Sequence, residues 1–348
     1  MIRKTGYILL SLTALLIGVM VLSSCIGAVE ISVPELLSIL ANRTGLSDVA
    51  NFRPQQAAVL LNIRLPRVFL GVLIGAGLGI SGAAIQGLFR NPLAEPGLIG
   101  ISSGATLFAV LMIVLEVGVF KSLSGVMGFY ALSLAAFTGA CITTGIVYRL
   151  SVRNGKTVIT TLLLSGIAIN ALAGAFTGLL TYMATDEQLR TITFWSLGSL
   201  GGASWATVTG LLPFILIPLA GLPFLAKSLN ALALGDAEAL HMGIDVIMIK
   251  RIIILLATMA VGASVAVAGI IGFIGLIVPH ILRMTFTADH RLVVPGSAIL
   301  GAALLSLADL VARTIVVPAE LPIGILTALI GTPVFLYIII TERNKNKI

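Results

Sequence analysis

Charge is what this sequence has little of. Only 10% of its 348 residues are charged, whereas 58% are hydrophobic, and the mean hydropathy is +1.12. Roughly a quarter of the residues of a soluble domain are charged, so these side chains are too few to cover a soluble protein of 36.1 kDa. The composition excludes a water-soluble enzyme. It also excludes a nucleic-acid-binding protein, which needs basic residues clustered on a solvated face. It predicts a polytopic membrane protein.

Cysteine and histidine are scarce as well. The two cysteines, Cys25 and Cys141, are too few for a disulfide framework, and no two of the three histidines stand at the spacing of metal ligands. Catalytic motifs such as HExxH or a paired-aspartate metal site do not occur in the sequence. We therefore predict no catalytic residue, no metal site and no cofactor site in this chain.

Long apolar runs, in contrast, are abundant. Ten of them are long enough to cross a membrane as helices, and they lie near residues 7–29, 68–88, 97–118, 126–148, 158–182, 199–225, 251–270, 272–287, 292–315 and 322–340. The first run follows Arg3-Lys4 and contains Leu22-Ser23-Ser24-Cys25, which resembles a lipoprotein signal. Because the apolar stretch continues to Val29, we expect an uncleaved first helix, and whether Cys25 is modified stays open.

The distribution of Lys and Arg predicts the orientation of the chain. If both termini are cytoplasmic, 14 of the 21 basic residues fall on the cytoplasmic side and seven on the other. Cytoplasmic loops of membrane proteins carry the excess of Lys and Arg. We therefore expect both termini in the cytoplasm.

The second and seventh predicted spans share a pattern of Gly and Pro. At an offset of 187 residues the matched positions are Gly75-Ala76 with Gly262-Ala263, Gly82 with Gly269, and Pro92 with Pro279. Because five spans separate the copies, they cross the membrane in opposite directions, and the repeat halves lie near 60–190 and 250–341. Inverted repeats are typical of transporters. An ion-coupled secondary transporter is therefore one candidate function, and coincidence among glycine-rich helices is the alternative.

Two motifs within the apolar runs predict packing. Gly71, Gly75 and Gly79 are spaced four apart, which places them on one helix face that another helix can approach closely. Asp309 is an acid inside the ninth span, and Arg313 follows it by one turn. We expect these two side chains to pair, because an unpaired charge at that depth is costly.

A third motif resembles a nucleotide site. Asn154-Gly155-Lys156-Thr157 contains the Gly-Lys-Thr of a phosphate-binding loop, but Leu150 stands where that loop needs its first glycine. We therefore expect no nucleotide site in this chain. If ATP drives the protein, another subunit hydrolyses it.

Two charged regions are candidate partner surfaces. The segment 225–251 mixes acids and bases with apolar anchors, which favours short amphipathic helices that dock a partner over a solvated loop. On the opposite side, Arg64 and Arg67 open the second span and Arg313 ends the ninth. These arginines either extend to lipid headgroups or form salt bridges with carboxylates of an external protein.

A series of short motifs runs through nearly the whole chain. In the first half they are Arg64-Leu65-Pro66-Arg67, Asn91-Pro92-Leu93-Ala94-Glu95-Pro96-Gly97, and Phe194-Trp195 followed by Gly198-Ser199-Leu200. In the second half they are Gly272-Phe273-Ile274-Gly275-Leu276, Pro279-His280, Asp289-His290-Arg291, Ala308-Asp309 with Ala312-Arg313, and Glu320-Leu321-Pro322-Ile323-Gly324. In this order they resemble the permease subunits of type II ATP-binding-cassette importers, the family that carries iron–siderophore chelates, haem and vitamin B12.

The resemblance implies an all-α fold and a set of partners. Residues 1–348 would form one transmembrane permease domain of about ten helices in a bacterial inner membrane, and it would homodimerise around a central pathway. Two cytoplasmic ATPase subunits, which hold ATP and Mg, and an extracytoplasmic substrate-binding protein would complete the importer. The segments 198–205, 235–239 and 318–322 are most similar to haem-type permeases, which favours haem slightly among the cargoes.

The resemblance also assigns roles to residues. Arg64, Arg67 and Arg313 occupy the positions that salt-bridge to glutamates of the binding protein in the vitamin B12 importer. The ATPase-coupling helices of the family match the segment 228–243, which includes Leu234, Gly235, Asp236, Glu238, Ala239, His241 and Gly243. The cytoplasmic loops near the pathway and its gate match Asn91, Pro92, Asn154, Gly155, Lys156 and Thr157.

Overall fold

A computed structural model of the chain describes residues 2–46, 51–115, 130–316 and 319–345. Seven of its helices are long and apolar enough to cross a membrane, and three shorter apolar helices accompany them. Together they match the ten predicted spans and confirm an all-α polytopic fold. The adjoining ends of the spans predicted at 97–118 and 126–148 lie partly outside the described residues.

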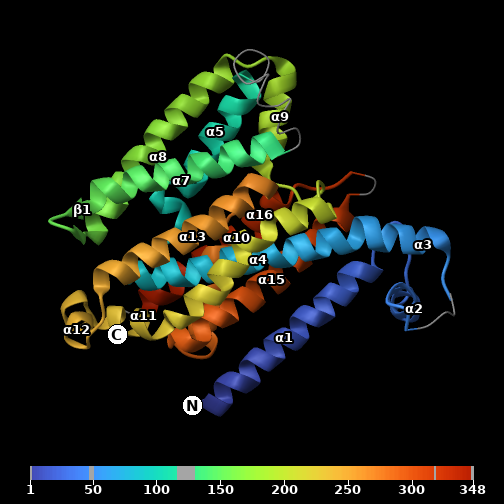
Figure 1. The fold of residues 1–348 in the computed structure, drawn as a ribbon, viewed down its shortest axis with the longest axis horizontal. Coiled ribbons are helices and arrows are strands. Elements are labelled where there is room, and N and C mark those ends of the chain that lie inside the picture. Colours follow the sequence, from blue (N-terminus) through green and yellow to red (C-terminus); the bar gives the residue numbers. More distant parts are fainter. Residues whose placement is uncertain (1, 47–50, 116–129, 317–318, 346–348) are drawn as a thin grey trace.

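The apolar helices follow the chain in the predicted order. Their bounds are α1 (Ile2–Cys25), α4 (Leu65–Phe89), α5 (Ile101–Leu115), α7 (Ala131–Ser151), α8 (Ile159–Tyr182), α10 (Trp205–Phe224), α13 (Val246–Ala268), α14 (Ile274–Thr285), α15 (His290–Ile315) and α16 (Ile323–Lys345). Figure 1 shows them as an elongated bundle, with α5, α7 and α8 forming a layer beside the rest.

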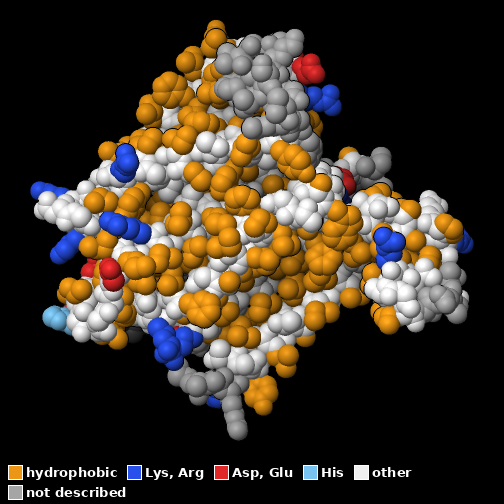
Figure 2. Space-filling view, in the orientation of Figure 1, with side chains coloured by type: hydrophobic (Ala, Val, Ile, Leu, Met, Phe, Trp, Pro, Cys, Tyr) orange, Lys and Arg blue, Asp and Glu red, His pale blue; other side chains and the backbone are white. Residues whose placement is uncertain are grey.

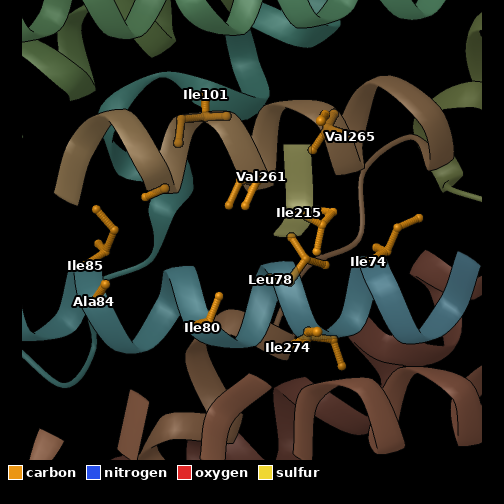
Figure 3. Close-up of a cluster of buried hydrophobic side chains, with 14 of the residues drawn as sticks. Ile74, Leu78, Ile80, Ala84, Ile85, Ile101, Ile215, Val261, Val265 and Ile274 are labelled. Atoms are coloured by element: carbon orange, nitrogen blue, oxygen red, sulfur yellow. The ribbon is translucent and has the colours of Figure 1, made fainter. Parts of the chain in front are cut away.

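Helix α4 is the centre of the bundle. Of its apolar window 89% is buried, compared with 17% of the window in α8. Because the surrounding lipid is as apolar as the side chains, close van der Waals packing rather than hydrophobic burial stabilises such a helix against its neighbours. Figure 3 shows side chains of α4 between α13, α10 and α14, with the labelled residues Ile74, Leu78, Ile80, Ala84, Ile85, Ile215, Val261, Val265 and Ile274.

The predicted glycine face is confirmed, and its partner is α15. A methyl group on Gly75 would lie 2.4 Å from the carbonyl oxygen of Gly301, and one on Gly79 would lie 2.1 Å from that of Ser297. Gly71 is less tightly packed, since a methyl group there would lie 3.4 Å from side-chain atoms of Leu200, in the loop before α10, and of Ser306 on α15. The backbones of α4 and α15 therefore approach as closely as small residues allow.

Short elements occupy the two ends of the bundle. At one end, called the α3 end, α2 (Val33–Arg43) is followed by α3 (Pro54–Val59), a π-turn (Leu60–Arg64) and then α4. Helix α9 (Asp186–Leu197) joins α8 to the loop before α10, whereas a 3-10 turn (Pro96–Ile99) follows the opposite end of α4 and precedes α5. The segments α2 and α9 were not among the predicted elements.

The opposite end, called the α12 end, carries the remaining elements. They are α11 (Ala226–Leu234), α12 (Asp236–His241) and the hairpin of β1 (Val152–Arg153) with β2 (Lys156–Thr157). Figure 1 shows that both termini also lie toward this end, away from α2 and α3. In Figure 2 the middle of the visible face is largely hydrophobic, whereas most Lys and Arg side chains lie at the two ends. This distribution suits a chain that spans a lipid bilayer.

The positions that suggested the internal repeat differ in local structure. Gly82 lies inside α4, whereas Gly269 ends α13 with a φ of +72°. Pro92 lies in the loop after α4, whereas Pro279 lies inside α14. The inverted repeat stays a prediction, and at these positions the two copies do not share their helix boundaries.

Candidate functional site

The predicted docking arginines gather at the α3 end, where α1, α4 and α15 meet. Arg67 binds Asp309 with two nitrogens, Nε at 3.0 Å and Nη2 at 2.8 Å, and its Nη1 lies 2.7 Å from Oε1 of Glu320. The Asp309 side chain is 4% exposed and that of Arg67 is 11%, so this bidentate pair is buried. Glu320 is 45% exposed and forms the outer side of the cluster.

Arg313 contacts the same carboxylate from the next turn of α15. Its Nε lies 3.9 Å from Oδ2 of Asp309, so the predicted i,i+4 ion pair is present but is longer than the pair with Arg67. The guanidinium of Arg313 also donates to the carbonyl and hydroxyl oxygens of Ser23 near the end of α1. A single buried carboxylate is therefore shared by two arginines.

Arg64 differs from the other two because it is enclosed. Only 4% of the residue is exposed, and its Nη1 donates to the carbonyl oxygens of Ser24 and Cys25 at 2.9 Å. Its Nη2 donates to the carbonyl of Val29. The last carbonyls of a helix have no partners of their own, so Arg64 acts here as a cap on α1. The docking role of Arg64 stays a prediction, and in this conformation its guanidinium is not offered to an external protein.

Glycine at position 27 belongs to this cap. Its φ is +156°, and a methyl group there would lie 2.5 Å from Nη2 of Arg64. The turn after α1 can therefore fold over the guanidinium only because residue 27 has no side chain.

The three arginines, Asp309 and Glu320 form one cluster, which we call the arginine cluster. Sequence reasoning noted Glu320 only as part of a family motif, and it did not pair Arg67 with Asp309 or Glu320.

The α12 end presents an apolar surface to solvent. Leu234 is 69% exposed, Leu240 62% and Met242 63%, and all three lie on α11, α12 or the turn that follows. Glu238 and His241 are exposed beside them, whereas Ala239 is buried against Ala231 and Leu232. Large apolar side chains exposed on short amphipathic helices are typical of a docking surface. We call these five exposed residues, Leu234, Glu238, Leu240, His241 and Met242, the coupling surface.

Asp236 ties the coupling surface to the bundle. Its Oδ2 lies 2.5 Å from Nζ of Lys250 on α13, and its Oδ1 lies 3.8 Å from Nη2 of Arg90 at the end of α4. Lys250 is only 2% exposed, and it also lies 3.4 Å from the carbonyl oxygen of Thr157 in β2. The first residue of α12 is therefore linked to α4, α13 and the hairpin.

Asn230 makes a second link, from α11 to the start of α15. Its Nδ2 donates to Oδ1 of Asp289 at 2.7 Å, and its Oδ1 accepts from the backbone N of His290 at 3.0 Å. Burial raises the pKa of the Asp289 carboxyl, but hydrogen bonds from Arg291 N and Asn230, with nearby positive charge, hold it below its usual range. Asn230 therefore joins α11 directly to the start of α15.

The predicted gate residues lie in a loop and a hairpin at the α12 end. Asn154 and Gly155 have φ values of +51° and +75°, as the type I′ turn of a two-residue hairpin requires, so the Gly-Lys-Thr motif forms a hairpin rather than a phosphate-binding loop. Asn91 accepts a hydrogen bond from the backbone of Leu93 and is exposed, and Pro92 is half-buried beside it. The gating role of these loops stays a prediction.

Comparisons with known proteins agree over nearly the whole chain. A model of the FecCD transport family matches residues 15–341. The hemin transport system permease protein of Yersinia pestis is 49% identical over 288 residues, which cover 82% of this chain and 84% of the relative. The cobalamin import system permease protein of Halobacterium salinarum is 43% identical over 287 residues, which cover 82% of this chain and 74% of that relative.

A solved structure agrees with the fold. It is a metal-chelate type ABC transporter in an inward-facing conformation, and it superposes with a TM-score of 0.84 at 33% sequence identity. The match covers 97% of this chain and 99% of the other. The arginine cluster and the coupling surface thus lie at opposite ends of a fold that is shared with a transporter.

Proposed function

The chain belongs to the FecCD transport family, and we propose that it is the membrane permease through which an ATP-binding-cassette importer moves a bulky metal chelate into the cell. The cargo is an iron chelate, such as haem or a ferric siderophore, or vitamin B12. The family match over residues 15–341 carries this proposal. The 49% identity to a hemin permease favours haem among these cargoes.

Energy comes from separate ATPase subunits in this proposal. The coupling surface exposes Leu234, Leu240 and Met242 at one end of the bundle, where a cytoplasmic partner can bury them. The links through Asp236 and Asn230 then carry a movement of α11 and α12 to α13 and α15. Rigid-body movement of this kind is a common way for a transporter to change its access.

A substrate-binding protein docks at the other end. The arginine cluster lies at the α3 end, where carboxylates of a partner can compete with Glu320 for the exposed side of Arg67. The complex lies in the bacterial inner membrane as a homodimer, with both termini and the coupling surface in the cytoplasm. The excess of basic residues at the α12 end supports this orientation.

Uptake by the assembled complex tests the proposal. The permease, its ATPase and its binding protein are reconstituted in proteoliposomes, and uptake of haem, a ferric siderophore and vitamin B12 is measured with and without ATP. We expect ATP-dependent uptake of one of these chelates. The Leu240→Glu variant places a charge in the coupling surface and should lower uptake at least about tenfold, because burying an unpaired carboxylate is costly.

Leu46→Glu is the matched control. Leu46 is 83% exposed, lies after α2 at the other end and belongs to neither the coupling surface nor the arginine cluster, so uptake should be unchanged. Uptake that follows an imposed ion gradient without ATP would instead identify a secondary transporter. Normal ATP-dependent uptake by Leu240→Glu would contradict the assigned coupling surface.

A further inference from the structure

A groove between α7 and α13 has no part in the proposed transport cycle. It opens near the α12 end and has a volume of about 360 Å³. Thr144 and Tyr148 of α7 line one wall, and Arg251, Leu255 and Thr258 of α13 line the other. Leu255 is 67% exposed, so the groove is open to the surroundings of the bundle rather than to its core.

The shape of the groove follows from one close contact between the helices. A methyl group on Gly262 would lie 3.1 Å from Cβ of Ala140, so α7 and α13 touch there. The groove occupies the stretch between this contact and the pair Tyr148 and Arg251, which lie near the end of α7 and the start of α13. It is lined mainly by apolar side chains, as a site for a hydrocarbon chain requires.

The mouth of the groove is positively charged. Nε of Arg251 donates to the Tyr148 hydroxyl at 2.8 Å, which fixes the plane of the guanidinium. In the part of the chain that the structure describes, no carboxylate lies within salt-bridge distance of Arg251. Arg149, Arg153 and Lys156 do not line the groove, but they are exposed at the same end of the bundle and add to its positive charge. The mouth therefore offers donors and positive charge for an anion.

A buried hydroxyl lies below the mouth. Thr144 is 4% exposed, and its Oγ1 has no hydrogen-bond partner among the described residues. Other helical threonines here, such as Thr138 and Thr258, donate to the carbonyl four residues earlier. Thr144 lies four residues before Tyr148, or about 6 Å along the helix axis. Because Thr144 lines the groove, its hydroxyl is a candidate donor to an acceptor that enters there.

We propose that this groove binds one anionic phospholipid, with its phosphate at Arg251 and an acyl chain between α7 and α13. Arginine binds phosphate oxygens with two parallel donors, and basic pockets between membrane helices are sites for anionic headgroups. The glycerol esters of a phospholipid lie a few ångströms below its phosphate, at the depth of the Thr144 hydroxyl. A free phosphate ion would leave the apolar groove empty, and a zwitterionic lipid would bring its own cation next to Arg251.

Lipid binding to the purified complex tests this site. The complex in mild detergent is titrated with phosphatidylglycerol and with phosphatidylcholine, and bound lipid is counted by native mass spectrometry. Wild type should bind phosphatidylglycerol more tightly than phosphatidylcholine. Arg251→Gln should weaken phosphatidylglycerol binding about tenfold, which corresponds to 1.4 kcal/mol. It should weaken phosphatidylcholine binding less, because the choline cation of that lipid already offsets the charge of its phosphate. Leu255→Trp fills the groove without a change of charge and should weaken both.

Arg190→Gln is the matched control. Arg190 is exposed on α9 and lies 5.7 Å from the ring centre of Phe194, so its loss removes one positive charge away from the groove. It should not change either affinity. Equal affinities for the two lipids in wild type, or full phosphatidylglycerol binding by Arg251→Gln or Leu255→Trp, would overturn the proposal. Inorganic phosphate that competes as well as the lipid would assign the site to a free anion.

A second copy of the chain is the other possible occupant. Cys141 lines the groove and is exposed. In the Cys25→Ser variant it is the remaining cysteine, so oxidation with copper phenanthroline followed by a non-reducing gel reports whether two Cys141 residues meet. We expect no covalent dimer. A dimer band would show that a partner copy covers the groove and would overturn the lipid assignment.

Discussion

At the scale of single residues, the ion pair between Arg67 and Asp309 has the largest predicted effect on stability. Replacing Asp309 with Asn leaves the 11%-exposed Arg67 side chain without its bidentate carboxylate. Breaking a buried ion pair by removing one partner costs about 3–5 kcal/mol. We therefore expect Asp309→Asn to lower the melting temperature strongly, as measured by tryptophan fluorescence of the purified protein in detergent.

Glu320→Gln is the control for this prediction, because it removes the other partner of the same arginine. The Glu320 side chain is 45% exposed, and exposed ion pairs contribute about 0–1 kcal/mol. The melting temperature of Glu320→Gln should stay close to that of wild type. If the two variants were equally unstable, burial would not be the reason for the strength of the Asp309 pair.

The same residues show what sequence reasoning can reach at this scale. The pair of Asp309 and Arg313 follows from helical spacing, and the structure contains it at 3.9 Å. The tighter pair of Arg67 with Asp309 joins residues 242 positions apart, so only the packing of α4 against α15 reveals it. Likewise, the motif around Arg64 is visible in the sequence, but its contact with three carbonyls of the first helix and turn is not.

At the scale of secondary structure, the close contact of α4 and α15 predicts that one added methyl group lowers the stability of the protein. In Gly79→Ala the new Cβ would lie 2.1 Å from the carbonyl oxygen of Ser297, and backbone cannot move aside as a side-chain tip can. Overpacking of this kind costs about 1–3 kcal/mol. We expect Gly79→Ala to lower the melting temperature and to increase the rate of limited proteolysis.

Gly178→Ala in α8 is the matched substitution. Nothing lies within 4 Å of a methyl group at that position, so the change only improves helix propensity, by up to about 1 kcal/mol. Its melting temperature should be unchanged or slightly higher. A loss of stability equal to that of Gly79→Ala would indicate a general intolerance of alanine rather than a contact between helices.

Secondary structure was predictable where apolar runs are long. The ten spans follow from hydropathy, and the glycine face of α4 follows from spacing. Helices α2 and α9 are short and of mixed composition, so hydropathy misses them. A different signal was present, since Ser32 with Glu35 and Thr185 with Gln188 form capping boxes at the starts of these helices.

At the scale of the whole molecule, the charge distribution predicts which end faces the cytoplasm. Most of the described basic residues lie at the α12 end, and at the α3 end Arg64, Arg67 and Arg313 are engaged by carbonyls or carboxylates. The unpaired positive charge is therefore even more uneven than the count of residues suggests. Because cytoplasmic loops carry this excess, the α12 end should be cytoplasmic and the α3 end extracytoplasmic.

Cysteine labelling of intact spheroplasts measures this orientation. In a background with Cys25→Ser and Cys141→Ser, Leu46→Cys places one thiol at the α3 end, and Lys156→Cys or His241→Cys places one at the α12 end, all at exposed positions. A membrane-impermeant maleimide should label Leu46→Cys in intact spheroplasts and the other two only after lysis. Labelling of Lys156→Cys before lysis would reverse the orientation, and the coupling surface would then face away from any cytoplasmic ATPase.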